Sequence, residues 1–194
     1  MYPPLDLLVP TWPDLAGWAS VGVAGLALAG VGRIVSGGAA RPEGALVAGW
    51  GAAALVLTLW GVATPLSLRA PAIAIVVAGL VALAVPRLRF TREDWLGVLR
   101  IAVLALPLVA VLASARPSEP DTFLNLLPNA AYLYDHAAFP TSSGPPSYSF
   151  LPVAPYNTQF VPFLGALFGG GLAANGLALF TVAPAARELP CTMA

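Results

Sequence analysis

The sequence has few of the residues that give a protein a charged surface. Of its 194 residues, nine are arginine, nine are acidic and none is lysine, so charged side chains make up 9% of the chain and the net charge is near zero. A soluble globular domain carries about 25% charged residues. This balance of charge excludes a basic nucleic-acid binder, and no nucleic acid is expected as a partner.

Cysteine and histidine are equally scarce. The chain holds one cysteine, Cys191, and one histidine, His136, so it has neither a disulfide framework nor a Cys-x-x-Cys metal pair. These two side chains leave almost nothing from which the protein alone could build a zinc site. Neither a metal ion nor an organic cofactor is predicted.

The sequence is instead rich in long apolar stretches. Hydrophobic residues make up 58% of the chain, which excludes both a disordered chain and an ordinary cytosolic domain. A helix needs about 20 apolar residues to cross a bilayer core about 30 Å thick. Five segments approach this length: 15–32, 44–68, 70–86, 95–115 and 163–182. We therefore predict an all-α, polytopic membrane protein with five transmembrane helices; since the third segment is short, four is the alternative.

Individual residues predict features of these helices. Asp14 can cap the first helix, and Pro107 should kink the fourth because it removes one backbone hydrogen bond. Gly25 and Ala29 have the spacing of a small-residue helix contact, which favours close packing in a membrane.

The arginines predict the orientation. Seven arginines belong to one set: those between spans one and two, those between spans three and four, Arg100 about one turn from the start of span four, and the one after span five. The alternate set holds two. Because cytoplasmic loops carry the basic excess, the N-terminus is expected outside. The preference for Ala, Gly, Pro and Arg indicates a bacterial source, hence the inner membrane. The expected regions are four spans over 1–115, an external loop over 116–158, and a fifth span with a short cytoplasmic tail over 159–194.

The external loop holds nearly all the polar side chains that could do chemistry. Connections this long are usually functional or disordered, and its aromatic content argues against disorder. Residues 121–136 have helical spacing, with a polar stripe opposite an apolar one, which predicts a helix lying in the membrane surface. Pro128 leaves one helix or two short ones open. The proline-rich stretch 139–162 should be extended.

Two stretches of this loop carry a resemblance: PDTFLNLLPNAAYLYDHAAFP at 120–140 and SYSFLPVAPYNTQFVPFLGALF at 147–168. They resemble the first large external loop of GT-C glycosyltransferases, a superfamily that includes bacterial aminoarabinose transferases and protein mannosyltransferases. In that superfamily an acidic motif, an amphipathic helix, a Phe/Pro-containing turn and an aromatic-Pro approach to the next helix follow one another.

The resemblance implies a function and a site. It implies transfer of a sugar from a polyprenyl-phosphate donor to an acceptor on the periplasmic face, with Asp121 as the catalytic base. Since these enzymes run to several hundred residues, it also implies that the chain is the N-terminal portion of one, and a truncated reading frame is the matching expectation. The partners would be membrane lipids, the polyprenyl-phosphate donor and the helices of other membrane proteins.

Other polar side chains of the loop are candidates for substrate binding, and each has a structural alternative. The candidates are Arg116, Asn125, Asn129, His136, Tyr156 and Gln159. A sugar could bond the two asparagines, a phosphate could pair with Arg116 or His136, and Tyr156 with Gln159 could line the site. The alternatives are helix capping for Asp121, a solvated helix face for the asparagines, a helix end in water for His136, interfacial anchoring for Tyr156 and Gln159, and snorkelling for Arg116.

A non-catalytic multi-pass subunit or scaffold, or an inactive truncated product, is the alternative function. A transporter half is disfavoured, because no predicted span carries a central ionisable pair.

Overall fold

The structure is a computed structural model, and it describes residues 12–114, 122–152 and 156–169. All regular structure within these ranges is helical, so the predicted all-α class is confirmed. The elements are α1 (Trp12–Val35), α2 (Pro42–Ala63), α3 (Arg69–Ala84), α4 (Arg92–Ser114), the π-helix η1 (Thr122–Leu126), α5 (Leu127–His136) and α6 (Phe160–Gly169).

The helix ends follow from local chemistry. α2 begins at Pro42, where the missing N–H costs nothing. α1 is followed by Gly37 and Gly38 at φ +60° and +87°, and a Cβ on Gly38 would lie 2.7 Å from the carbonyl oxygen of Arg87, so glycine is required there. α1 begins at Trp12, and Asp14 is therefore inside the helix. The side chain of Asp14 lies outside the described part of the structure, so its expected capping role stays a prediction.

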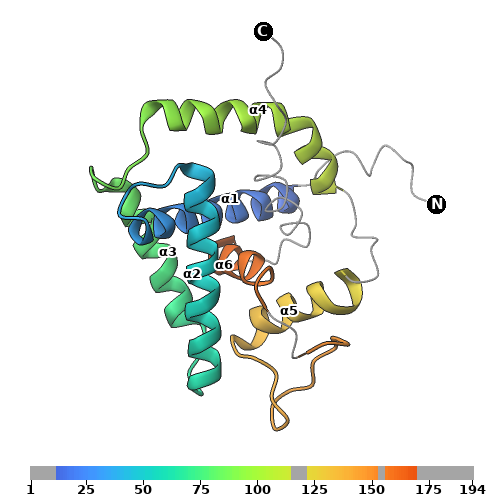
Figure 1. Cartoon of the computed structure of the whole chain (residues 1–194). Helices are drawn as coiled ribbons and strands as arrows, with labels where there is room; N and C mark the ends of the chain where they lie inside the picture. The colour runs from blue at the N-terminus through green and yellow to red at the C-terminus, as the bar shows by residue number, and fades with distance from the viewer. Residues whose placement is uncertain (1–11, 115–121, 153–155, 170–194) are drawn as a thin grey trace, which may run out of the picture.

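Small residues let α1 pack closely between α2 and α3 (Figure 1). A Cβ on Gly30 would collide with the backbone of Gly79 in α3, and a Cβ on Gly32 would collide with the backbone of Ala45 in α2. Close packing was expected, but a Cβ on Gly25 would meet nothing within 4 Å. The helices therefore meet at other glycines than the one that the spacing indicated.

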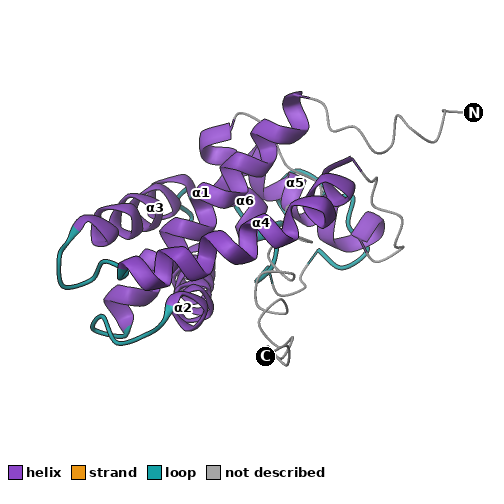
Figure 2. Ribbon diagram, turned by 90° about the horizontal axis from the view of Figure 1, so that it is seen from above, coloured by secondary structure: helices purple, strands orange, loops and turns teal. Residues whose placement is uncertain are grey.

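α4 lies across this group in Figure 1 and over it in Figure 2, which looks down from that side. Its start is fixed by an edge-on contact between Phe90 and Trp95, whose ring centres are 5.7 Å apart. Pro107 lies inside α4, as expected, and Figure 1 shows the helix changing direction in its C-terminal half.

Two helices are long and apolar enough to cross a membrane: α1 over Leu15–Val35 and the whole of α2. α3 has 16 residues, the first half of α4 carries four charged residues, and α6 is described over ten residues. The prediction of five spans is therefore supported for two helices and not for the other three.

Arg33 ties together the connections at one end of α1. Its Nε donates to the carbonyl oxygen of Leu88 at 2.7 Å, and its Nη1 donates to that of Ala40 at 2.6 Å. Its Nη2 reaches the carbonyl oxygen of Arg89 at 3.2 Å, and the guanidinium lies 5.2 Å from the centre of the Phe90 ring. One side chain thus joins the α1–α2 connection to the α3–α4 connection.

Candidate functional site

The predicted external loop is folded against the helices. η1 and α5 together occupy the stretch expected to be helical, and the helix type changes at Leu127, next to Pro128. Residues 139–152 and 156–159 have no helix or strand, as the prolines predicted. The helical run is continuous from Thr122 to His136, since Leu126 is itself helical at φ −68° and ψ −49°, and only the helix type changes within it.

The loop is attached to the connection between α2 and α3. α5 ends at His136, and the residue that caps it, Ala137, is left-handed at φ 49°. The Ala137 carbonyl accepts a hydrogen bond from the Leu68 N–H at 2.7 Å. Phe139 follows and lies against Gly61 of α2, where a Cβ would come 2.5 Å from its ring. The missing side chain at Gly61 makes the space that this ring occupies.

Aromatic rings form the centre of the loop. The ring centres of Phe139 and Tyr156 are 4.8 Å apart, and Phe160 lies 6.2 Å from the first and 6.4 Å from the second. Such distances are favourable for aromatic pairs. The cluster joins the start of the extended stretch, at Phe139, to the start of α6, at Phe160, so the two ends of that stretch are held together.

Asn129 and Tyr156 donate hydrogen bonds to backbone carbonyls of the extended stretch. The Asn129 Nδ2 donates to the carbonyl oxygen of Leu151 at 3.1 Å, and the Tyr156 hydroxyl donates to that of Pro152 at 2.7 Å. The two side chains also approach each other, with 3.5 Å between the Tyr156 hydroxyl and the Asn129 Oδ1. Asn129 is fully buried and Tyr156 is 6% exposed.

Burial changes the acidity of Tyr156. Loss of solvation, with a smaller contribution from the neighbouring Tyr132, raises the pKa of Tyr156 to about 12. A phenol in this environment stays neutral at physiological pH and acts as a hydrogen-bond donor.

α5 turns the middle of its polar stripe toward the protein. Asn129 and Tyr132 are buried, and the Tyr132 hydroxyl donates to the carbonyl oxygen of Pro145 at 3.1 Å. Leu124 on the apolar side is exposed, while Leu127 and Ala131 are half-buried. The alternative of a solvated face for Asn129 is therefore wrong, because this face satisfies the carbonyls of the extended stretch.

The structure brings together two of the candidate residues, Asn129 and Tyr156. Gln159 is 2% exposed, and its Oε1 accepts a hydrogen bond from the Thr158 hydroxyl at 3.2 Å. Asn125 is half-buried on η1. His136 is exposed in the last turn of α5, with its ring 4.4 Å from that of Tyr132.

The candidate base Asp121 and the candidate phosphate ligand Arg116 lie outside the described residues.

One anchor was not found from the sequence. The Trp50 indole N–H, from within α2, donates to the carbonyl oxygen of Asn157 at 2.8 Å. A tryptophan inside an apolar helix needs a hydrogen-bond acceptor for its N–H, so the sequence could have predicted that Trp50 has such a partner. The partner, 107 residues away along the chain, could not be identified from it.

The described residues contain no group of three or more His, Cys, Asp or Glu side chains placed to hold a metal ion. What they offer is a buried amide and phenol that fix the loop, an exposed imidazole, and an ordered surface at one end of the apolar helices. Comparisons of the chain with protein-family profiles, with curated proteins and with solved structures found no match, so the chain is assigned to no family.

Proposed function

We propose that the chain is a membrane glycosyltransferase of GT-C type, or the N-terminal portion of one. It transfers a sugar from a polyprenyl-phosphate donor to an acceptor on the periplasmic face of the bacterial inner membrane. In this proposal five helices cross the membrane with the N-terminus outside, and Asp121 takes the proton of the attacking hydroxyl.

The distribution of apolar side chains supports the membrane placement. On α2, Leu55, Leu59 and Val62 are exposed at 60%, 58% and 77%. The closest approaches of α1 to α2 and α3 are made at glycines, next to a core that also holds larger buried side chains. A soluble protein places large apolar side chains inside, while helices in lipid pack through small residues. The exposed apolar side chains of α2 and the close glycine contacts of α1 support the membrane placement.

The ordered loop is the observation that carries the transferase proposal. Residues 122–152 and 156–159 fold onto the helices through Leu68, Trp50 and an aromatic cluster, and they cover most of the stretch that resembles the GT-C loop. A transferase needs its acceptor and donor groups on a fixed surface, since catalysis depends on their relative position.

Substitution of the candidate base tests the proposal. The gene is first sequenced beyond this chain to find any further apolar spans, and the whole reading frame is then expressed. The transfer of labelled sugar from polyprenyl-phosphate donors is measured in membranes that contain the protein. Asp121→Asn should lower transfer by about a hundredfold or more, as expected for loss of a general base, at an unchanged protein level. Asp135→Asn, an exposed carboxylate at the end of α5, is the matched control and should keep near-normal activity. Retained transfer in Asp121→Asn would show that this carboxylate is not the base.

A second function, a non-catalytic membrane subunit or scaffold, is favoured by one observation. The amide of Asn129 and the hydroxyls of Tyr132 and Tyr156 all donate to carbonyls of the loop itself. Side chains used in this way hold a shape and are not free to bind a sugar. A locus with no further spans, together with no transfer by the chain, would support this function.

A further inference from the structure

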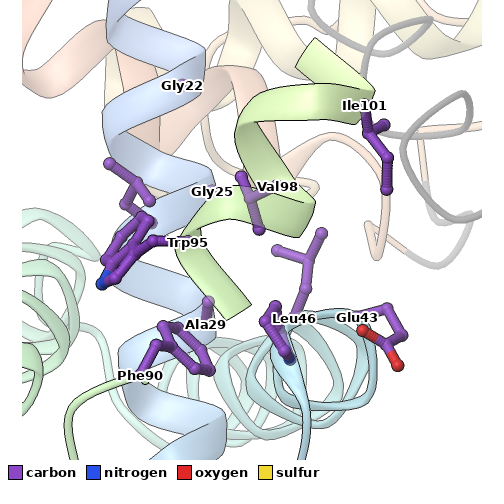
Figure 3. A pocket seen from close by; sticks show the side chains of 11 residues that line it. Gly22, Gly25, Ala29, Glu43, Leu46, Phe90, Trp95, Val98 and Ile101 are labelled. Carbon is purple, nitrogen blue, oxygen red and sulfur yellow. The ribbon is translucent and has the colours of Figure 1, made fainter. Parts of the chain in front are cut away.

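A cavity lies between α1, α2 and the first half of α4, away from the loop (Figure 3). Its volume is about 220 Å³, and its lining is almost entirely apolar. Figure 3 shows Val98 and Ile101 pointing from α4 toward the side of this space where Leu46 and Glu43 of α2 lie. The residues that line it include Gly22, Gly25, Pro42, Glu43, Phe90 and Val98.

Two glycines of α1 help to keep the cavity open, beside the side chains of Leu26 and Ala29 that also line it. A Cβ built on Gly22 or on Gly25 meets nothing within 4 Å, in contrast to the glycines at the helix contacts. Glycine inside a helix costs about 1 kcal/mol relative to alanine. These two positions therefore keep space open at a cost in helix stability, without serving the packing of α2 or α3.

One end of the cavity is basic. The Arg33 guanidinium lies 5.2 Å from the centre of the Phe90 ring, which lines this end. Arg41 directly precedes the lining residue Pro42, and Arg92 begins α4. With Arg87 and Arg89 in the same connection, five arginines gather where the three helices end or begin.

The acidic groups at this end are fewer. Glu43 lines the cavity on the α2 side, and Glu93 lies in the first turn of α4. The third, Asp94, accepts hydrogen bonds from the backbone N–H and the hydroxyl of Thr91, at 3.0 and 2.8 Å. Five arginines against three carboxylates leave an excess of positive charge next to an apolar cavity.

We propose that this cavity binds one anionic glycerophospholipid of the bilayer, with an acyl chain between α1 and α4 and its phosphate at the arginine end. The apolar lining matches a hydrocarbon acyl chain, which is removed from water when it enters the cavity and needs no hydrogen-bond partner there. The charge excess matches an anionic headgroup, as in other basic pockets between membrane helices. Both halves of the ligand are thus accounted for, and a neutral phospholipid would satisfy only one.

Lipid binding is measured by native mass spectrometry of the whole chain in detergent, with phosphatidylglycerol and phosphatidylcholine as probes. One phosphatidylglycerol should be retained per chain. Gly25→Leu fills the cavity and should weaken this binding by about tenfold, the equivalent of 1.4 kcal/mol. Gly51→Leu is the matched control, because Gly51 lies on the exposed face of α2 and a Cβ there also meets nothing within 4 Å. Equal retention by the two variants would overturn the proposal.

The cavity can also be filled from the opposite wall. Val98→Trp on α4 leaves α1 unchanged, so it gives the same readout if Gly25→Leu fails to fold. It should also weaken phosphatidylglycerol binding by about tenfold. Unchanged binding in a folded Val98→Trp protein would overturn the proposal.

The headgroup is tested separately. The double variant Arg41→Gln, Arg92→Gln should lose the preference for phosphatidylglycerol over phosphatidylcholine, while Arg33 is kept because it holds the connections together. Equal binding of the two lipids by the unchanged chain would overturn the proposal. The proposal requires the membrane placement but not the sugar transfer, and the binding assay reads the lipid site whether or not the chain is active.

Discussion

Tyr156 performs at least two structural tasks at once. Its ring packs between Phe139 and Phe160, and its hydroxyl holds the carbonyl of Pro152 at 2.7 Å. A buried carbonyl that loses its donor costs about 1–3 kcal/mol. Tyr156, which the sequence indicated as a candidate for substrate binding, thus holds the loop together.

We expect Tyr156→Phe to lower the free energy of unfolding by about 1–2 kcal/mol, because the ring stays and only the hydroxyl is lost. Thermal unfolding in detergent micelles measures the change. Tyr148→Phe is the control, since Tyr148 is 90% exposed, and it should have no effect. Equal melting temperatures for the two variants would mean that the hydroxyl does not stabilise the loop.

The acidity of Tyr156 gives a second prediction. Its pKa of about 12 lies above the value of 10.0 for a free tyrosine, so folding favours the neutral phenol. This stabilisation is complete below pH 10 and should be lost as the pH rises toward 12. Ultraviolet titration should show one of the five tyrosines ionising last, and Tyr156→Phe should remove that step. A late step that persists in the variant belongs to another tyrosine.

At the scale of the elements, the sequence located the helices but not their contacts. The uncharged stretch 15–32 lies within α1, and 44–68 overlaps α2, because hydrophobic length needs no partner to be recognised. Gly22, Gly25, Gly30 and Gly32 are alike in the sequence, and their roles depend on which residue lies opposite. The same limit applied to α5, where two stripes were evident but not which of them faced the protein.

The contact between α1 and α3 provides the prediction at this scale. Gly30→Ala would place a methyl group against the backbone of Gly79, which cannot move as a side chain can. We expect a loss of about 1–3 kcal/mol from overpacking, larger than the helix-propensity gain of about 1 kcal/mol. Gly51→Ala, on an exposed face, should keep that gain and raise the melting temperature. The same direction of change in both variants would contradict the close contact.

The whole molecule has two chemically different ends. Arg33 and its neighbours bind the connections at one end, while the aromatic loop is held near the C-terminal end of α2 through Phe139 and Gly61. The sequence predicts the orientation only from the excess of arginine in the connections between α1 and α2 and between α3 and α4. Of the candidate site, the sequence predicted the loop and its helix. It could not predict that Asn129 and Tyr156 would be used inside the loop, because their partners are backbone carbonyls, which every residue has.

The orientation is tested by placing one cysteine at each end. After Cys191→Ser, Ser143→Cys in the exposed loop should react with a membrane-impermeant thiol reagent in intact cells. Ala39→Cys, exposed in the α1–α2 connection, should react only after the membrane is opened, because the proposed orientation puts the arginine-rich end in the cytoplasm. Ala39 serves better than Gly38, whose positive φ a cysteine would strain. Labelling of Ala39→Cys alone in intact cells would reverse the orientation and move the loop, with any transfer reaction, to the cytoplasmic face. Labelling of both positions would instead mean that one of the intervening helices does not cross the bilayer, and α3, with its 16 residues, would be the first to re-examine.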